Sequence, residues 1–259
     1  MAAMRKIFLV LLLLGSSPVF AAGNPATTAE DAAHYQTCLS RSQNDPQSAL
    51  EDAMHWRANG GGIPAAHCEA LSLVSLGRFT EAARKLSDLA ENPRAESMRP
   101  QLLDQAGNAW LLAQQPGFAL PLFSAAIAAE PRNVDYYADR ARARAMHSDW
   151  SGADADLTQA LGLDRQRADL FVLRASARHA MGRRAEARAD LERALAIVPA
   201  YPEALVERGQ LKQEAGDAAG ARADWQTVVQ HAPQSDAGVA ARARLEALDS
   251  MPKAPAKKR

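Results

Sequence analysis

The sequence predicts an all-α protein in which helix pairs stack side by side as an α-solenoid. The chain has 259 residues and is 47% hydrophobic but only 5% aromatic, which favours close packing of small helix faces over one large globular core. Alternating β-branched runs, the pattern typical of strands, are missing from the sequence. Sequence features recur with a period of about 34 residues, which indicates repeated structural units.

The repeat period is carried by several independent features. The triplets ADL, ADL and ADW begin at positions 155, 189 and 223, and Pro131, Pro199 and Pro233 stand on one ladder of the same period. Each period contains a helical segment, a short turn and a second helical segment, which ends near the proline because proline cannot continue a helix. One helix pair cannot bury its apolar face alone, so neighbouring pairs are expected to share a continuous core.

These units resemble tetratricopeptide repeats, whose pattern is a large residue, a small residue, an aromatic, and then alanine, aromatic, alanine and proline. The second unit follows this pattern at Leu103, Gly107, Trp110, Ala119, Phe123, Ala126 and Pro131. The third has Tyr137, Ala141, Ala153, Leu157 and Ala160, and the fourth has Phe171, Ala175, Ala187, Leu191, Ala194 and Pro199. The fifth has Leu205, Gly209, Ala221, Trp225 and Pro233, and a weaker first unit has Ala66, Ala70, Leu73, Ala82, Leu86 and Leu89.

The resemblance implies a right-handed α-solenoid of about five tetratricopeptide helix pairs with N- and C-terminal helical caps. The expected order along the chain is a signal peptide at 1–21, an N-terminal helical cap or degenerate repeat at 22–62, the tetratricopeptide-repeat solenoid at 63–235, a C-terminal capping helix at 236–249 and a basic disordered tail at 250–259. A loop over residues 91–100 is expected to insert a few residues before the second unit.

The N-terminus has the pattern of a secretory signal peptide. Arg5 and Lys6 precede an apolar run of about nine residues, and small residues follow up to a cleavage point after Ala21. The run is too short to span a bilayer, which takes roughly 20 apolar residues, and no other segment is apolar enough to cross one. Because the signal looks bacterial, we expect a periplasmic protein, with secretion as the alternative.

The charge balance gives no case for nucleic acid. Removing the leader takes Arg5 and Lys6 from the 30 basic side chains and leaves the 30 acidic ones unchanged, whereas nucleic-acid binding needs a concentrated basic face. The tail carries a small basic cluster, made of Lys253, Lys257, Lys258 and Arg259. It is interpreted as a solvated end, with weak attachment to anionic envelope surfaces as the alternative.

The two cysteines, Cys38 and Cys68, predict a disulfide, the ordinary state of a cysteine pair in an exported protein. The alternative is a metal site that adds His34 and His67, with His55 nearby. Zinc sites usually have tighter paired spacings, and adjacent residues of a helix point about 100° apart, so His67 and Cys68 are poorly placed to share an ion. No metal and no cofactor are expected.

A basic row is predicted along the repeats. It consists of Arg140, Arg144, Arg174, Arg178, Arg208 and Lys212. The acidic residues expected to neutralise it are Asp139, Asp156, Asp190 and Asp224. The row is either a set of structural ion pairs or solvated side chains, or a face for an anionic ligand.

The predicted function is non-catalytic, because no nucleophile, base and orienting acid form a recognisable arrangement. In the family, the first helix of each pair lines a concave groove that holds peptides or helices. Carried over to this sequence, the groove positions are His67, Leu71, Asp104, Asn108, Ala138, Arg142, Val172, Ser176, Val206 and Gln210. Each position is also compatible with an ordinary solvated surface. We expect a protein or peptide partner of unknown identity, bound by a scaffold; the alternative is a folding or assembly chaperone that holds clients transiently.

Overall fold

The computed structural model describes residues 29–250, and its regular elements in that range are helices. The predicted signal peptide (1–21) and the tail from residue 251 lie outside the described residues. Within the described range, no helix combines the length and the apolar character needed to cross a bilayer. Internal contacts divide the chain into two compact units, called here the N-terminal unit (29–148) and the C-terminal unit (149–250).

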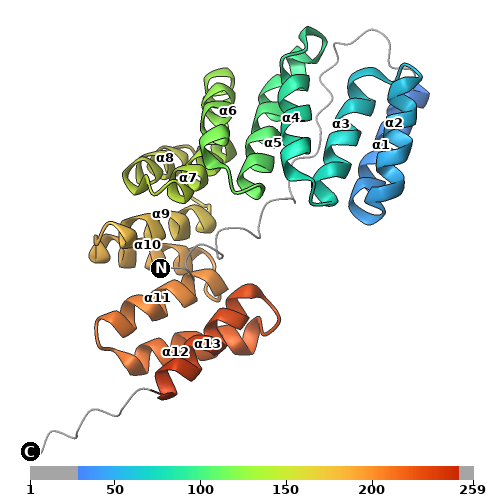
Figure 1. Ribbon diagram of the computed structural model, residues 1–259. Coiled ribbons are helices and arrows are strands. Elements are labelled where there is room, and N and C mark those ends of the chain that lie inside the picture. Colours follow the sequence, from blue (N-terminus) through green and yellow to red (C-terminus); the bar gives the residue numbers. More distant parts are fainter. Residues whose placement is uncertain (1–28, 251–259) are drawn as a thin grey trace, which may run out of the picture. The chain divides into compact units, whose positions relative to one another are not determined.

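In the N-terminal unit, neighbouring helices contact one another in chain order (Figure 1). The helices are α1 (Ala29–Asn44), α2 (Pro46–Ala58), α3 (Gly62–Ser75), α4 (Phe79–Ala90), the 3-10 helix η2 (Pro93–Met98), α5 (Arg99–Leu112), α6 (Pro116–Ala129) and α7 (Val134–Met146). The pair α1–α2 lies where the N-terminal cap is predicted, and α3–α4 and α5–α6 are the first two predicted repeats. The expected loop before the second repeat contains η2, whose start is capped by the Asn92 side chain.

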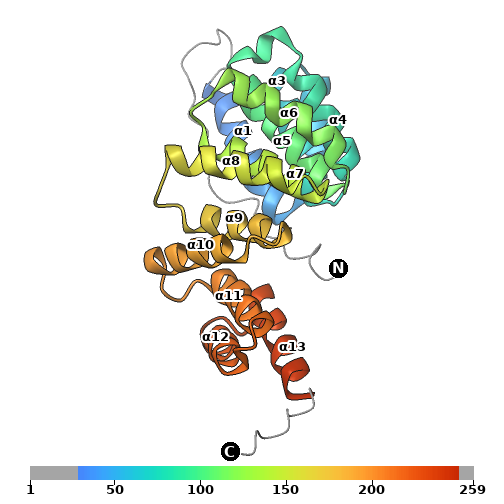
Figure 2. The ribbon, with the colours of Figure 1, turned by 90° about the vertical axis from the view of Figure 1, so that its left-hand side faces the viewer.

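The C-terminal unit is built in the same way (Figure 2). Its helices are α8 (Trp150–Leu163), α9 (Ala168–Ala180), α10 (Arg184–Ile197), α11 (Pro202–Glu214), α12 (Ala218–His231) and α13 (Asp236–Ser250). The pairs α9–α10 and α11–α12 are the fourth and fifth predicted repeats, and α13 is the predicted capping helix. The boundary between the two units falls inside the third predicted repeat, between α7 and α8. The all-helical fold with adjacent-helix packing is the predicted fold class.

The turn inside each of the five predicted repeats uses one left-handed residue. These residues have φ between 60° and 85° and are Gly77, Gln114, Ser148, Gly182 and Gly216. The last four are each separated by one repeat period, so the period seen in the sequence is also a period of backbone conformation. The amide after this turn residue donates back to the first helix, for example from Arg183 N to Arg178 O at 2.8 Å, which ends the helix in the usual glycine-type cap.

The packing between the two helices of a pair depends on small residues opposite aromatic ones. Phe123 of α6 is fully buried, and it lies against Gly107 of α5. A Cβ atom at position 107 would stand 2.6 Å from Cε1 of Phe123, which is closer than real Cβ contacts. The small residue required by the repeat pattern is therefore a requirement of interhelical distance.

Replacing Gly107 by alanine is expected to destabilise the N-terminal unit by about 1–2 kcal/mol. Overpacking costs ~1–3 kcal/mol and the better helix propensity of alanine returns up to ~1 kcal/mol. Gly117→Ala is the matched control, because nothing lies within 4 Å of an added Cβ there, and it should be neutral or mildly stabilising. Urea unfolding of both variants checks the difference; equal midpoints would show that α5 and α6 are less tightly packed than described.

Candidate functional site: the first-helix faces

The first helices of successive pairs lie next to one another and carry the residues predicted to bind a ligand. In the N-terminal unit α5 contacts α7, and in the C-terminal unit α11 contacts both α9 and α13. We call the surface that bears the ten predicted groove residues the first-helix face of each unit. It is made by α3, α5 and α7 in the N-terminal unit and by α9 and α11, with α13 beside them, in the C-terminal unit.

The ten predicted residues divide by burial. Five are buried, namely His67, Ala138, Val172, Ser176 and Val206. These five side chains are covered within the described fold, and direct ligand contact at them stays a prediction. The other five keep partial exposure, namely Leu71, Asp104, Asn108, Arg142 and Gln210. Four of these five are polar or charged.

Three of the exposed set join one further residue, and we call the group of Asp104, Asn108, Asp139 and Arg142 the Asp104 cluster. Asn108 Nδ2 donates to Asp104 Oδ2 at 3.2 Å and to Asp139 Oδ2 at 2.9 Å. Arg142 donates to Asp139 Oδ1. The cluster connects α5 to α7 and leaves Oδ1 of Asp104 and Oδ1 of Asn108 buried without a hydrogen-bond partner among the described residues.

The electrostatics of this cluster favour the protonated form of Asp104. Burial of the carboxyl group raises the pKa of Asp104 well above its usual range. Asp139 raises it further by its charge and through a hydrogen bond, and Asp135 adds a smaller effect, while Arg142 acts in the opposite direction. Asp104 therefore holds its proton at a higher pH than an ordinary aspartate does.

His67 lies inside the N-terminal unit instead of on its surface. Its Nδ1 is hydrogen-bonded to the Tyr35 hydroxyl, and its Nε2 bonds Gln105 Oε1 at 2.6 Å. Burial lowers the pKa of His67 to about 4, and the hydrogen bond to Gln105 offsets part of that effect. His67 is thus a neutral link between α1, α3 and α5.

Cys38 of α1 and Cys68 of α3 stand at disulfide distance, with their Cα atoms 6.1 Å apart. Both residues are fully buried. The histidines of the alternative metal site have other partners: His34 bonds Asp52 at 2.8 Å and stacks on Trp56. His67 is engaged by Tyr35 and Gln105 as described above. The arrangement fits the predicted disulfide, whose formation stays a prediction to be measured.

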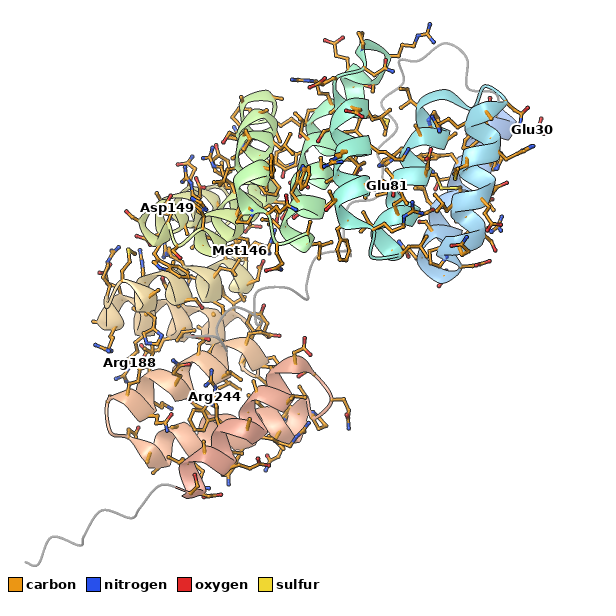
Figure 3. All side chains as sticks on the ribbon, viewed as in Figure 1. Glu30, Glu81, Met146, Asp149, Arg188 and Arg244 are labelled. Atoms are coloured by element: carbon orange, nitrogen blue, oxygen red, sulfur yellow. A yellow bond between two sulfur atoms is a disulfide. The ribbon has the colours of Figure 1, made fainter. Side chains whose placement is uncertain are left out.

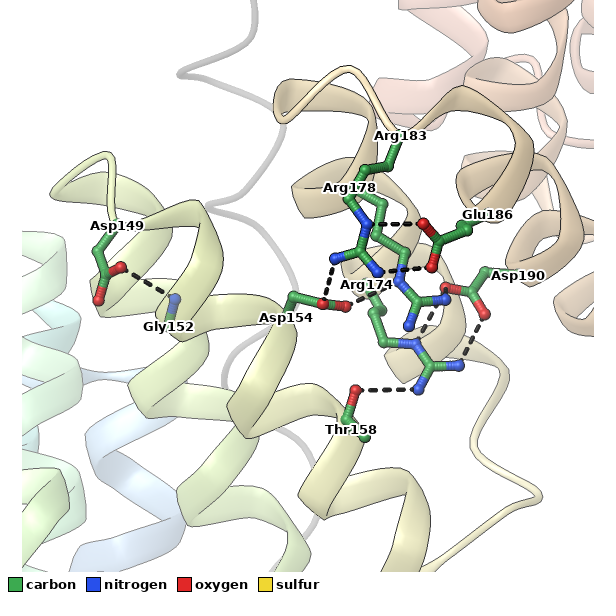
Figure 4. Close-up of polar contacts among 9 residues, drawn as sticks. All are labelled: Asp149, Gly152, Asp154, Thr158, Arg174, Arg178, Arg183, Glu186 and Asp190. Carbon is green, nitrogen blue, oxygen red and sulfur yellow. Dashed lines mark hydrogen bonds and ion pairs between the residues drawn. The ribbon is translucent and has the colours of Figure 1, made fainter.

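The basic row is a set of ion pairs in the C-terminal unit (Figure 4). Arg174 donates two hydrogen bonds of 2.7 and 3.0 Å to the carboxylate of Asp190, and Arg178 donates a third at 2.8 Å. One repeat later, Arg208 and Lys212 hold Asp224 in the same way. Of the two interpretations of the row, the structure supports ion pairs at these residues.

Asp139 is an exception among the acidic residues expected to neutralise the row. It bonds Asn108 and Arg142, as part of the Asp104 cluster. The reason is visible in the spacing: Asp156, Asp190 and Asp224 follow the repeat period on second helices, whereas Asp139 lies on the first helix α7. The expectation for Asp139 therefore needs correction.

Replacing Asp190 by asparagine is expected to lower the free energy of unfolding of the C-terminal unit by about 2 kcal/mol. The change removes the charged acceptor of Arg174 and Arg178, and hydrogen bonds to charged groups contribute roughly 1.5–3 kcal/mol. Glu192→Gln on the same helix is the control, because its side chain is 53% exposed and its pair with Arg188 is worth only ~0–1 kcal/mol. Thermal unfolding of both variants measures the gap, and equal effects would refute the structural role of Asp190.

The first-helix face of the C-terminal unit carries residues that the sequence interpretation missed. Gln210 Oε1 accepts from Arg244 of α13 at 2.9 Å, and His179 bonds Glu214. Burial raises the pKa of Glu207, and the charges of Arg244 and His179 offset part of the effect. Arg244 could have been predicted from the sequence, because it follows Gln210 by one repeat period. This spacing places Arg244 at the groove position of the capping helix.

A cavity of about 250 Å³ lies elsewhere in the N-terminal unit. It is lined by Arg57, Ala66, Glu69, Lys85, Asp88, Leu89 and Asn92. Glu69 is buried there and pairs with Arg57 at 2.7 Å and Lys85 at 2.8 Å. None of the ten predicted groove residues lines this cavity, so it is separate from the first-helix face.

Residues 203–235 match the family model of the tetratricopeptide repeat. No curated protein gives a significant sequence match to the chain. Among solved structures, TTC0263, a thermophilic tetratricopeptide-repeat protein of Thermus thermophilus, is similar with a TM-score of 0.59 at 19% identity, covering 73% of this chain and 100% of that one.

MamA proteins are similar as well. The MamA structure from residue 41 to the end, from Desulfovibrio magneticus RS-1, has a TM-score of 0.59 at 17% identity and covers 68% of this chain and 99% of that one. A second MamA crystal structure has a TM-score of 0.55 at 17% identity, covering 62% and 92%. Likeness at these identities concerns the fold. Residues 203–235 thus match a tetratricopeptide repeat, and the chain shares the helix-pair fold of these solved structures.

Proposed function

We propose that this protein is a non-catalytic scaffold of the bacterial periplasm that binds a protein or peptide partner on its first-helix faces. The observation that carries the proposal is the row of partly exposed polar side chains on consecutive first helices, with Asp104 and Asn108 on α5 and Arg142 on α7. Polar side chains that still have free hydrogen-bond donors or acceptors, and that are held on rigid helices, can bind the backbone and side chains of an extended peptide segment.

Two features support the periplasmic location. The N-terminal sequence has the basic, apolar and small-residue regions of a signal peptide. Cys38 and Cys68 stand at disulfide distance, and disulfides persist in oxidising compartments. The proposal predicts release by osmotic shock of a protein whose mass lacks residues 1–21. Retention in the cytoplasm with an intact N-terminus would refute the location.

The binding proposal is tested by comparing two double variants in affinity purification from envelope extract. Asn108→Ala with Arg142→Gln alters the first-helix face of the N-terminal unit. Glu81→Ala with Arg188→Ala alters the second helices, at half-buried Glu81 of α4 and exposed Arg188 of α10 (Figure 3). The first variant is expected to lose about tenfold in partner affinity, or roughly 1.4 kcal/mol, with helicity unchanged. The second is expected to bind as the wild type does.

Equal loss in both variants, or in neither, would refute the first-helix face as the binding surface. Suppression of aggregation of unrelated clients, without any stable partner, would identify a transient chaperone instead of a scaffold.

A further inference from the structure

Two acceptor atoms of the Asp104 cluster are unused. Oδ1 of Asp104 and Oδ1 of Asn108 are covered from solvent and have no hydrogen-bond partner among the described residues. Asp104 and Asn108 are four residues apart on α5, so their side chains stand on the same face one turn apart. Buried acceptors are normally paired, and these two unpaired oxygens belong to residues one helical turn apart.

The donors within the cluster are already committed. Asn108 Nδ2 serves one oxygen of Asp104 and one of Asp139, and Arg142 serves the other oxygen of Asp139. Arg142 is the one cation of the cluster, which has two carboxyl groups, those of Asp104 and Asp139. The charge of Asp135 further raises the pKa of Asp104. The cluster is therefore short of both N–H donors and positive charge.

We propose that the Asp104 cluster receives a positively charged side chain, lysine or arginine, of the bound partner segment. This inference rests on the proposed function and names the chemistry of the partner. An ammonium or guanidinium group supplies several N–H donors from one centre, so a single group can bond both free acceptors. Hydrogen bonds between such cations and carboxylates are among the strongest in proteins.

The C-terminal unit contains an equivalent pair in which the acceptor is filled. Gln210 and Arg244 follow Asn108 and Arg142 by three repeat periods. There the amide oxygen of Gln210 accepts from a guanidinium nitrogen of Arg244 at 2.9 Å. At the equivalent position of the N-terminal unit the guanidinium of Arg142 bonds Asp139 instead, and the oxygen of Asn108 stays unpaired.

A cation at this position also changes the protonation of the cluster. The charged groups that act on Asp104 are Asp135, Asp139 and Arg142, all on α7. A bound cation favours the ionised carboxylate and lowers the pKa of Asp104. Binding therefore favours loss of the proton from Asp104, and the preference for a basic side chain should strengthen as the pH rises.

The experiment measures how strongly the full chain retains pools of twelve-residue peptides. One central position is fixed as Lys, Arg, Gln or Glu, the other positions are degenerate, and both peptide ends are capped so that terminal charges play no part. The wild type is expected to retain the Lys or Arg pool about tenfold over the Gln pool at pH 8, with a smaller ratio at pH 5. Whichever of the two basic pools is retained more identifies the preferred cation.

Asp104→Asn keeps the size of the side chain and removes its charge, so it should bring the ratio near one at both pH values. Glu91→Gln is the control, since it removes an exposed negative charge at the end of α4 and should leave the ratio unchanged. The inference is overturned if the Lys and Gln pools are retained equally, or if the preference persists in Asp104→Asn. Either result leaves the proposed scaffold function unaffected. Retention of no pool by the wild type overturns both.

Discussion

Reducing the Cys38–Cys68 pair is expected to lower the free energy of unfolding of the N-terminal unit by about 3.5 kcal/mol. The two residues are separated by 30 positions, and closing a loop of that length restricts the unfolded chain by roughly this amount. Both cysteines are fully buried, and the predicted bond connects α1 to α3. Urea unfolding with and without reductant measures the effect, and faster amide exchange in α1 and α2 should accompany it.

The control is the double variant Cys38→Ala with Cys68→Ala, which should not respond to reductant. The predicted bond is also checked directly by mass. Protein purified from the periplasm without reductant should take up no alkylating agent until it is reduced and unfolded. Two alkylated thiols before reduction would refute the bond.

Acidification from pH 6.5 to pH 4 is expected to cost the N-terminal unit about 3 kcal/mol through His67. Burial lowers the pKa of His67 to about 4, against 6.5 for an ordinary histidine. The unfolded chain therefore binds a proton in this window that the folded chain does not. The stability contributed by His67 is complete above pH 6.5 and is lost as the pH falls towards 4.

The measurement is the slope of unfolding free energy against pH in the wild type and in His67→Gln. The variant loses contacts to Tyr35 and Gln105 at every pH, so its absolute stability drops, but its slope between pH 4 and 6.5 should be flatter. Exposed His55, replaced by glutamine, is the control and should leave the slope as in the wild type. Parallel curves for the wild type and His67→Gln would contradict the buried neutral histidine.

Much of the fold could be predicted from the sequence because its determinants are local and periodic. The prolines and turn glycines of the repeat mark where helices end, and Gly107 opposite Phe123 sets the distance within a pair. The capping helix, expected at 236–249, spans Asp236–Ser250. Such features depend on residues within one repeat, which the sequence shows directly.

The site was harder to predict, because exposure depends on how one repeat packs against the next. The groove position of α3 holds His67, whose partners Tyr35 and Gln105 lie 32 and 38 residues away and enclose it. At the other groove position of each helix, Leu71 on α3 and Asn108 on α5 both stay partly exposed. Contacts between repeats decide this difference, and a family pattern that describes one repeat does not contain them.

The central claim, that the first-helix faces bind the partner, is tested most directly by site-specific photo-crosslinking in the native envelope. A photoreactive amino acid is placed at Leu71 on α3 and Gln210 on α11, and for comparison at Glu81 on α4 and Arg188 on α10. We predict that the first two positions crosslink one partner, identified by mass spectrometry, and that the other two do not. Crosslinks to a partner only from Glu81 and Arg188 would contradict the claim and place binding on the second helices.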